Sequence, residues 1–411
     1  MHQSSGRGGS GPGRPAAVLR ILIAGAIAVL AAVVPLSAHT PVAQAGGDPA
    51  AGERPCDIYS SGGTPCVGAY STVRSLYSGK DGPLYQVTRE SDRKTLIVAS
   101  ESGYADVSGQ DSFCRESLCR ITRLIDQSPM RNDLAVAPEG GYGGPNKGVI
   151  ADALPVTVNG HRAYGMKFTG EMGYRNATRT RGVATGSEPE SMYMLSSNRL
   201  YNAECCFTFG NTSAIPRDNG NGHMDSIYYG SALSGRECVS PALVEVGCRD
   251  NGIRGPMVAA DLENGIFRSA VKLNQDTDHP GADFPFATAV LKNDGKRRFS
   301  LRSGDAHGGA LNTHWDGSLP GVPLDLPGVD VPSLPGLDSI RPGHSATFNV
   351  PYTGYMPMKK EGGIGLGVGG DNANLGQGIF FEGALTDGYP STNIDDRVHA
   401  DIVAAGYSYD D

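Results

Sequence analysis

Two adjacent cysteines, Cys205 and Cys206, constrain this chain more than any other feature. They lie in the stretch 202–211, and aromatic residues follow them. A disulfide between neighbours closes a small ring and holds the intervening peptide away from its relaxed geometry, which proteins tolerate mainly at functional sites. We therefore expect a rigid, apolar sulfur surface that fits one face of a small ring-shaped ligand such as a sugar. The alternative is that each cysteine pairs with a distant partner.

The N-terminal region has the features of a secretory signal. The first residues are rich in glycine and serine and carry two arginines, and residues 16–36 are almost wholly apolar. The small-x-small pattern Ala43-Gln44-Ala45 follows as a cleavage site. We predict a signal peptide over 1–45, a short linker over 46–55 and a secreted, extracellular protein with no membrane contact once the signal is removed. The alternative is an uncleaved N-terminal anchor.

All the cysteines follow the signal and are even in number, as expected of an extracellular protein. By proximity they sort into four local pairs, although other pairings stay open. A zinc site is not expected, because no CxxC pair has a matching set of histidines or cysteines. We predict neither a metal nor a cofactor. The eight cysteines are Cys56, Cys66, Cys114, Cys119, Cys205, Cys206, Cys238 and Cys248.

The composition favours an all-β domain. Glycine accounts for 58 of 411 residues, and many short apolar runs stand between turn residues. The formal net charge is −8, and no basic cluster is interleaved with aromatic residues. Nucleic acid is therefore not an expected partner.

Several local patterns predict strands. Residues 95–99 are apolar and predict a buried strand, and residues 120–126 predict a strand beside Cys119. The pair Asn159-Gly160 stands between two short apolar runs and predicts a hairpin over 155–164.

A proline-rich segment interrupts this pattern near the C-terminal end. Leu-Pro-Gly units begin at Leu319, Leu326 and Leu334. Proline cannot donate a hydrogen bond to a sheet, so we predict a surface insertion at about 316–346 within one domain over 56–411. The insertion is either a partner-binding loop or a tolerated excursion of the chain.

The segment 257–263 predicts a strand with two acidic residues on one face. The core face would carry Val258, Ala260 and Leu262. Asp261 and Glu263 would then project side by side, about 6.5–7 Å apart, and could contact one ligand. The alternative is a solvated sheet edge that carries two acids.

A glycine-rich strand predicted over 362–372 favours a ligand-binding site over a solvated sheet edge. Its apolar residues bury one face, while alternating glycines leave the other face bare and open to close approach. Asp371 follows where this strand is expected to end, at the rim of a groove. Two opposed carboxylates beside a flat apolar surface suffice for glycoside hydrolysis, in which one protonates the leaving oxygen and the other attacks the sugar or activates water.

At this point the sequence resembles a known family, the arabinofuranosidase B enzymes of glycoside hydrolase family 54. The resemblance runs in order from about Cys56 to Tyr407. The matching pieces are 56–59, 64–67, 110–114 with Cys119, 126–128, 202–211, Gly222-His223-Met224-Asp225 with 226–228, Asp261-Leu262-Glu263-Asn264, Gly369-Gly370-Asp371-Asn372, 377–378, 382–383 and 388–390.

The resemblance implies a β-sandwich of the concanavalin-like, jelly-roll type that removes terminal α-L-arabinofuranosyl groups with retention of configuration. It implies that Glu263 is the nucleophile and Asp371 the general acid/base. The residues implied to bind the sugar are Asp261, Asn264, Gly370 and the Cys205–Cys206 disulfide.

The same resemblance implies the disulfides Cys56–Cys66 and Cys114–Cys119, which leaves Cys238–Cys248 as an addition in this chain. The expected partner is a carbohydrate with arabinofuranosyl groups, on a polysaccharide or an oligosaccharide.

Three departures from the family pattern concern the substrate. The chain ends at Asp411, without the arabinose-binding β-trefoil expected after the sandwich. The family's tryptophan at the sugar site has no counterpart, because the one tryptophan is Trp315, and Gly265 stands where a second asparagine is expected. Two alternatives follow: a furanosidase for galactofuranose or D-arabinofuranose of cell-wall polymers, or a sandwich that binds sugar without cleaving it.

Overall fold

The computed structural model describes residues 52–217, 219–231, 256–270, 281–320 and 354–410. The predicted signal peptide lies outside these residues, as do the Cys238–Cys248 pair and most of the expected proline-rich insertion. Within them, no helix is long and apolar enough to cross a membrane.

The described part of the chain is built mainly from antiparallel strands, which confirms the all-β prediction. One sheet has six strands in the order β1 (Cys66–Ser71), β21 (Glu382–Asp387), β11 (Glu190–Ser196), β16 (Ala287–Asn293), β17 (Arg298–Asp305) and β18 (Asn312–Ser318). The other has eleven, in the order β15 (Ile266–Phe267), β14 (Met257–Asp261), β13 (Asp225–Gly230), β12 (Thr208–Thr212), β19 (Gly363–Leu366), β10 (Tyr174–Asn176), β6 (Leu134–Val136), β5 (Cys119–Leu124), β2 (Pro83–Arg89), β3 (Thr95–Glu101) and β4 (Tyr104–Ala105). Two small sheets pair β20 (Gln377–Phe380) with β9 (Met166–Thr169), and β7 (Pro155–Val158) with both β22 (Tyr407–Tyr409) and β8 (His161–Tyr164).

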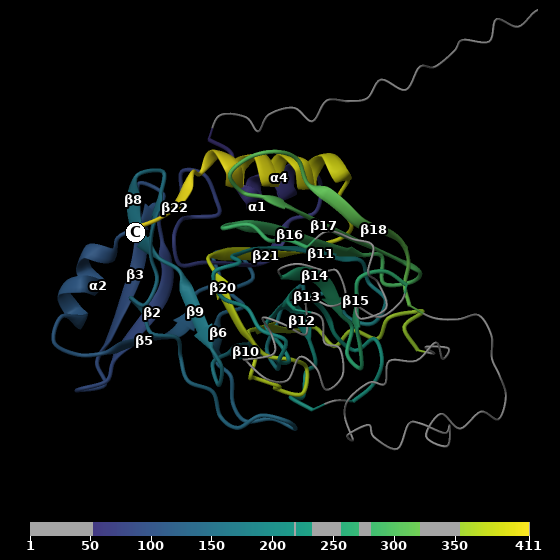
Figure 1. The fold of residues 1–411 in the computed structure, drawn as a ribbon, viewed down its shortest axis with the longest axis horizontal. Coiled ribbons are helices and arrows are strands. Elements are labelled where there is room, and N and C mark those ends of the chain that lie inside the picture. The colour runs from purple at the N-terminus through teal and green to yellow at the C-terminus, as the bar shows by residue number, and fades with distance from the viewer. Residues whose placement is uncertain (1–51, 218, 232–255, 271–280, 321–353, 411) are drawn as a thin grey trace, which may run out of the picture. The chain divides into compact units, whose positions relative to one another are not determined.

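The two large sheets pack face to face as a sandwich (Figure 1). Phe209 of β12 lies so close to β21 that a Cβ atom on Gly383 would come within 2.7 Å of the phenylalanine ring. The same ring packs against Tyr70 and Phe380, with ring centroids 6.1 and 5.4 Å away. Aromatic and aliphatic side chains from both sheets therefore form one buried core.

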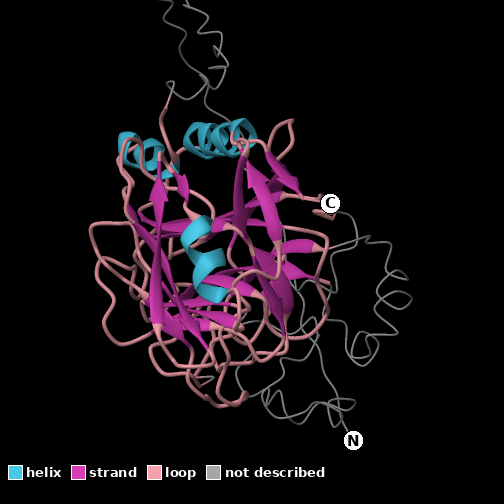
Figure 2. Cartoon of the chain, turned by 90° about the vertical axis from the view of Figure 1, so that its left-hand side faces the viewer, coloured by secondary structure: helices cyan, strands magenta, loops and turns pink. Residues whose placement is uncertain are grey.

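The helices lie on the outside of this sandwich (Figure 2). Helices α1 (Pro55–Ser61) and α4 (Thr392–Ala404) cover the six-stranded sheet on the side away from the other sheet, and α2 (Val107–Cys114) lies beside β2 and β3 (Figure 1). The sequence did not lead us to predict α4.

Three of the local predictions can be compared with the structure. The Asn159-Gly160 hairpin is present, with φ of 49° and 78° at the two turn residues, as a type I′ turn requires. The strand predicted at 120–126 is β5. The strand predicted at 95–99 is β3, but the expectation that it is buried was wrong: β3 lies next to the short edge strand β4, and Ile97 is 47% exposed.

Candidate active site

Strand β14 positions the first acidic residue of the site. Val258 and Ala260 lie in the main core, whereas Met257 and Ala259 belong to a separate apolar cluster on the opposite face. This alternation matches the predicted pattern and puts Asp261 on the face opposite the core.

Glu263 does not continue this strand, which corrects the expected spacing. The strand ends at Asp261, and both Glu263 and Asn264 have positive φ, of 58° and 56°. The turn brings the Glu263 backbone N–H to Asp261 Oδ1 at 3.2 Å. The two acids therefore meet through a tight turn and not through the 6.5–7 Å repeat of a strand. A glutamate in this conformation needs surrounding contacts to hold it.

Several contacts hold Glu263, which is 5% exposed. The Ser213 hydroxyl donates to Oε2 at 2.8 Å, and the Asn219 backbone N–H donates to Oε1 at 3.3 Å. The Tyr355 hydroxyl donates to the Glu263 carbonyl oxygen at 3.0 Å. Both the backbone and the carboxylate of Glu263 are thus fixed in place.

The glycine-rich segment brings Asp371 to the same place. Strand β19 ends at Leu366, earlier than predicted, and Gly367 has φ of 75°. After it the chain turns, and the Asn372 N–H donates to the Gly369 carbonyl at 3.1 Å. Asp371 is half-buried, and its Oδ1 accepts from the Ala373 N–H at 2.9 Å.

Two glycines of this turn touch the other parts of the site. A Cβ atom on Gly370 would lie 2.9 Å from Oε1 of Glu263. A Cβ atom on Gly369 would lie 3.6 Å from the Cys206 sulfur. Because glycine has no side chain, the turn that carries Asp371 fits between the Glu263 carboxylate and the disulfide.

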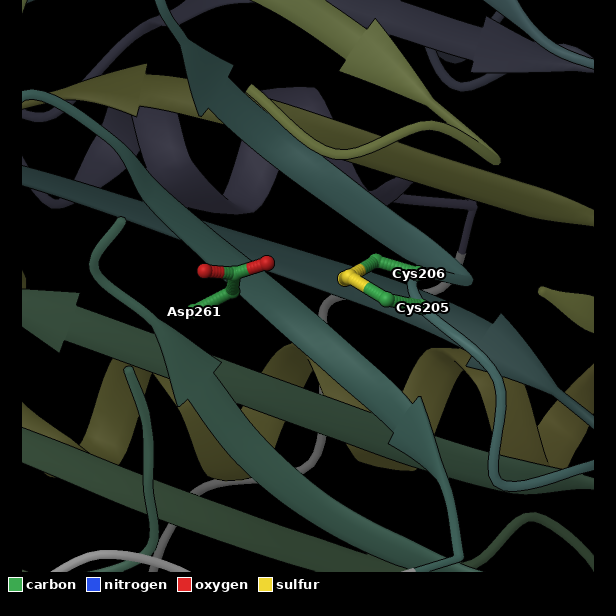
Figure 3. A group of neighbouring side chains, drawn as sticks. All are labelled: Cys205, Cys206 and Asp261. Atoms are coloured by element: carbon green, nitrogen blue, oxygen red, sulfur yellow. A yellow bond between two sulfur atoms is a disulfide. The ribbon is translucent and has the colours of Figure 1, made fainter. Parts of the chain in front are cut away.

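Cys205 and Cys206 are bonded to each other, and the peptide bond between them is cis. The disulfide packs against the apolar cluster of Tyr228, Met257, Ala259 and Ile266. The Asp261 carboxylate lies beside it: one oxygen and both sulfurs are all within 4.8 Å of one another (Figure 3). This closeness does not make a metal site, because disulfide sulfurs are not thiolates.

The remaining predicted positions are placed as follows. Asn264 directly follows Glu263 and is half-buried. Cys56–Cys66 and Cys114–Cys119 are bonded, as the family resemblance implies. Trp315 is on β18 of the six-stranded sheet, where its indole N–H donates to the Ser318 carbonyl at 3.2 Å, so it is not part of this site.

Sequence reasoning missed a second layer of residues beneath the site. Glu361 accepts hydrogen bonds from the Ala214 N–H (2.7 Å), the Asn219 side chain (2.7 Å) and His223 Nδ1 (3.0 Å). Glu361 thereby fixes the segment that carries Ser213 and Asn219, the two donors to the Glu263 carboxylate. Asn219 donates to Glu263 from its backbone N–H and to Glu361 from its side chain. No side-chain pattern in a sequence reveals a backbone contact such as the first.

Arg175 was missed as well. This strand residue of β10 is 5% exposed and lies under the Gly369–Gly370 turn, to whose carbonyl oxygens it donates. Burial lowers the pKa of its guanidinium to about 10, while the negative charges of Glu263, Asp371 and Glu361 act in the opposite direction.

The sequence matches a known protein family. The family model described as "Alpha-L-arabinofuranosidase B, catalytic" matches residues 55–326 and 336–408, so it omits part of the expected proline-rich insertion. Alpha-L-arabinofuranosidase B of Emericella nidulans is 43% identical over 361 residues, and that of Aspergillus oryzae is 42% identical over 362 residues. Each alignment covers 86% of this chain, and the chain spans 62% of the length of each relative.

Solved structures give the same result. The fold is similar to an arabinofuranosidase complexed with arabinofuranosyl-alpha-1,2-xylobiose and to a GH54 α-L-arabinofuranosidase soaked with a cyclic sulfate inhibitor. In both comparisons the TM-score is 0.71 and the identity 36%, over 87% of this chain and 66% of the other. The chain therefore belongs to the alpha-L-arabinofuranosidase B catalytic-domain family, glycoside hydrolase family 54.

Proposed function

We propose that this protein is a secreted, retaining α-L-arabinofuranosidase that releases terminal arabinofuranosyl groups from polysaccharide or oligosaccharide side chains. The observation that supports the proposal is the packing of Gly370 against the Glu263 carboxylate, because Asp371 is the next residue of that turn. Family membership supports the sugar specificity, since the similar proteins are named for α-L-arabinofuranosides.

The reaction proceeds by double displacement. A Glu263 oxygen attacks the anomeric carbon while the bond to the leaving oxygen breaks, and Asp371 donates its proton to that oxygen. Asp371, now a carboxylate, then takes a proton from water as the water oxygen attacks the anomeric carbon and releases Glu263 from the ester. Each displacement inverts the carbon, so the product retains its configuration.

The other side chains hold and orient the sugar. The disulfide offers an apolar face to the furanose ring, and the Asp261 carboxylate beside it accepts hydrogen bonds from ring hydroxyls. Asn264 and the Gly370 backbone supply further polar contacts. Ser213 orients the nucleophile through its hydrogen bond to Oε2.

A screen of aryl furanosides tests the proposal. The purified protein should hydrolyse 4-nitrophenyl α-L-arabinofuranoside faster than the β-D-galactofuranoside or the α-D-arabinofuranoside. NMR of the first product formed should show the α-anomer. Faster hydrolysis of either competing furanoside would contradict the substrate assignment, and a β-anomer as first product would contradict retention.

A second candidate substrate is favoured by one observation. Trp315 lies on the six-stranded sheet and packs against Phe299 of the core, so the described residues provide no tryptophan beside the sugar surface. A differently shaped pocket would suit galactofuranose or D-arabinofuranose of a cell-wall polymer, and the same screen decides between them. Binding without turnover of any furanoside would favour a purely sugar-binding sandwich.

A further inference from the structure

The glycine face of β19 that we expected to admit a ligand is covered by Thr212, to which Arg175 is bonded: a Cβ atom on Gly365 would lie 3.3 Å from the Thr212 methyl group. Tyr174, the neighbour of Arg175, lies in the core, so Arg175 is on the opposite face of β10. In the sheet register Arg175 stands opposite Gly365 of β19, and Gly365 stands opposite Gly210 of β12. The guanidinium reaches across β19 to Thr212 of β12.

The contacts of Arg175 gather on one nitrogen. Nη2 donates to Thr212 Oγ1 at 2.7 Å, to the Gly370 carbonyl at 2.8 Å and to the Gly369 carbonyl at 3.0 Å. Nε and Nη1 are buried and have no hydrogen-bond partner in the described part of the chain. Arg175 is 5% exposed and its remaining nitrogen, Nη2, is already bonded to three protein oxygens, so we assign it no direct contact with the sugar.

A cation in this position needs a compensating charge. A buried guanidinium with two unpaired nitrogens is costly unless negative charge lies nearby. The acids whose charge acts on Arg175 are Glu263, Asp371 and Glu361, all from the site or the layer beneath it. This arrangement differs from the buried Arg74, whose Nε bonds Glu382 at 2.6 Å in an ordinary ion pair.

We propose that Arg175 is a positioning residue of the active site. Its Nη2 fixes the Gly369 and Gly370 carbonyls, so that Asp371 is held opposite Glu263, and its positive charge favours the ionised, nucleophilic form of Glu263. The inference rests on the proposed function and extends it to a residue that touches neither the substrate nor the reacting atoms.

The charge is needed because the site gathers acids. Asp261 bonds the Glu263 backbone N–H, Asp371 follows the Gly370 that packs against the Glu263 carboxylate, and Glu361 is linked to Glu263 through Asn219. Each of these carboxylates disfavours a second negative charge on Glu263. Two further titratable groups belong to this network: His223 pairs with Glu361 at 3.0 Å, and the Tyr355 hydroxyl donates to the Glu263 carbonyl.

Two variants separate the two roles. Arg175→Met removes both the charge and the hydrogen bonds, so kcat/KM should fall at least 100-fold and the acidic limb of its pH profile should move up by about one pH unit. Arg175→Lys keeps a positive charge, but the lysine side chain is shorter than that of arginine, so its ammonium group does not reach the position of Nη2 and the hydrogen bonds to the Gly369 and Gly370 carbonyls are weakened or lost. It should lower kcat about 10-fold while leaving the acidic limb near that of the wild type.

A control variant and a second measurement keep the test decisive. Arg74→Met also removes a buried arginine and should lower the melting temperature without moving the pH profile. The Glu263 carboxyl carbon can be assigned in ¹³C-glutamate-labelled protein as the resonance lost in Glu263→Gln. Its titration midpoint should rise in Arg175→Met, and this readout does not depend on turnover.

The outcomes distinguish the inference from the proposed function. If the wild type cleaves no furanoside, the proposed function fails, while the carbon titration still decides whether Arg175 favours the charge on Glu263. An unchanged titration midpoint in Arg175→Met would overturn the inference, whatever the activity. Wild-type kcat in Arg175→Lys would overturn the positioning role, and this variant also decides that point if Arg175→Met does not fold.

Discussion

Gly370 lies directly against Glu263, so that a Cβ atom on the glycine would come within 2.9 Å of the carboxylate oxygen Oε1 and 3.0 Å of the Ser213 hydroxyl. Real Cβ atoms are essentially never found so close to another heavy atom. The turn that carries Asp371 can therefore approach Glu263 only because residue 370 has no side chain.

This contact predicts the effect of a single methyl group. Gly370→Ala should push the Glu263 carboxylate or the Asp371 turn aside and lower kcat/KM by about 10- to 100-fold, because both groups must be aligned with the sugar. Gly144→Ala is the control, since a Cβ atom there meets nothing within 4 Å. Equal activity of the two variants, measured on an aryl arabinofuranoside, would show that the contact is unimportant.

Glu263→Gln tests the nucleophile. The change removes the negative charge but little volume, so turnover should fall by several orders of magnitude while the melting temperature stays within a few degrees. Glu171→Gln, at an exposed ion pair with Lys147, should keep wild-type activity. Residual activity of Glu263→Gln near that of the wild type would rule out the assignment.

Asp371→Asn tests the general acid. Substrates with poor leaving groups need a proton delivered to the leaving oxygen, whereas activated aryl glycosides do not. The variant should therefore lose far more activity on an arabinofuranosyl oligosaccharide than on the 4-nitrophenyl glycoside. Equal losses on both substrates would point to a different acid.

The disulfide is expected to shape the site and not to hold the fold together. Adjacent cysteines close almost no chain, so Cys205→Ser/Cys206→Ser should leave the melting temperature within a few degrees of the wild type. KM should rise and kcat/KM should fall, because the sugar loses the surface that aligns it. Non-reducing mass spectrometry should show one peptide with both cysteines, linked to no other, and a link to another peptide would contradict the structure.

A buried acid of helix α4 predicts a pH dependence of stability. Burial raises the pKa of Asp395 to about 6, although Lys292 lies 2.6 Å away and opposes the shift. A carboxyl with a raised pKa binds more protons in the folded state, so its contribution to stability is present below pH 4 and lost as the pH rises to about 6.

Asp395→Asn should remove this loss. We expect the difference in the free energy of unfolding, variant minus wild type, to rise by up to about 3 kcal/mol between pH 4 and pH 7, as measured by urea unfolding. Asp316→Asn is the control, because its carboxylate is 40% exposed and pairs with Arg298, whose side chain is 54% exposed. A constant difference between Asp395→Asn and the wild type across this range would contradict the prediction.

Local alternation explains why much of the site could be predicted from the sequence. A strand with small and apolar residues at every second position has only one good way to bury them, and this put Asp261 on the open face of β14. What followed the strand could not be predicted, because the positive φ of Glu263 depends on Tyr355 and Ser213, which are distant in sequence.

Two misses have physical causes of their own. Helix α4 buries Ile394, Val398 and Ile402, and this four-residue spacing does indicate a helix. However, Asp395 and Asp401 of the same helix are also buried, because they form ion pairs with Lys292 and Arg74. These buried charges obscured the apolar pattern in the sequence. The bare glycine face of β19 was predicted to admit a ligand. Thr212 covers it instead and is held by Arg175, and a single arginine in a three-residue strand gives no signal in the sequence.

The proposed double displacement requires that Glu263 forms a covalent bond to the sugar. The most direct test is to inactivate the purified protein with an electrophilic cyclic sulfate of arabinofuranose configuration and to map the modified peptide by mass spectrometry. We expect one sugar-derived mass on the peptide that contains Glu263, and protection by free arabinose. A label on another residue, or full activity after prolonged incubation with the inactivator while the 4-nitrophenyl glycoside is still hydrolysed, would contradict the proposed double displacement.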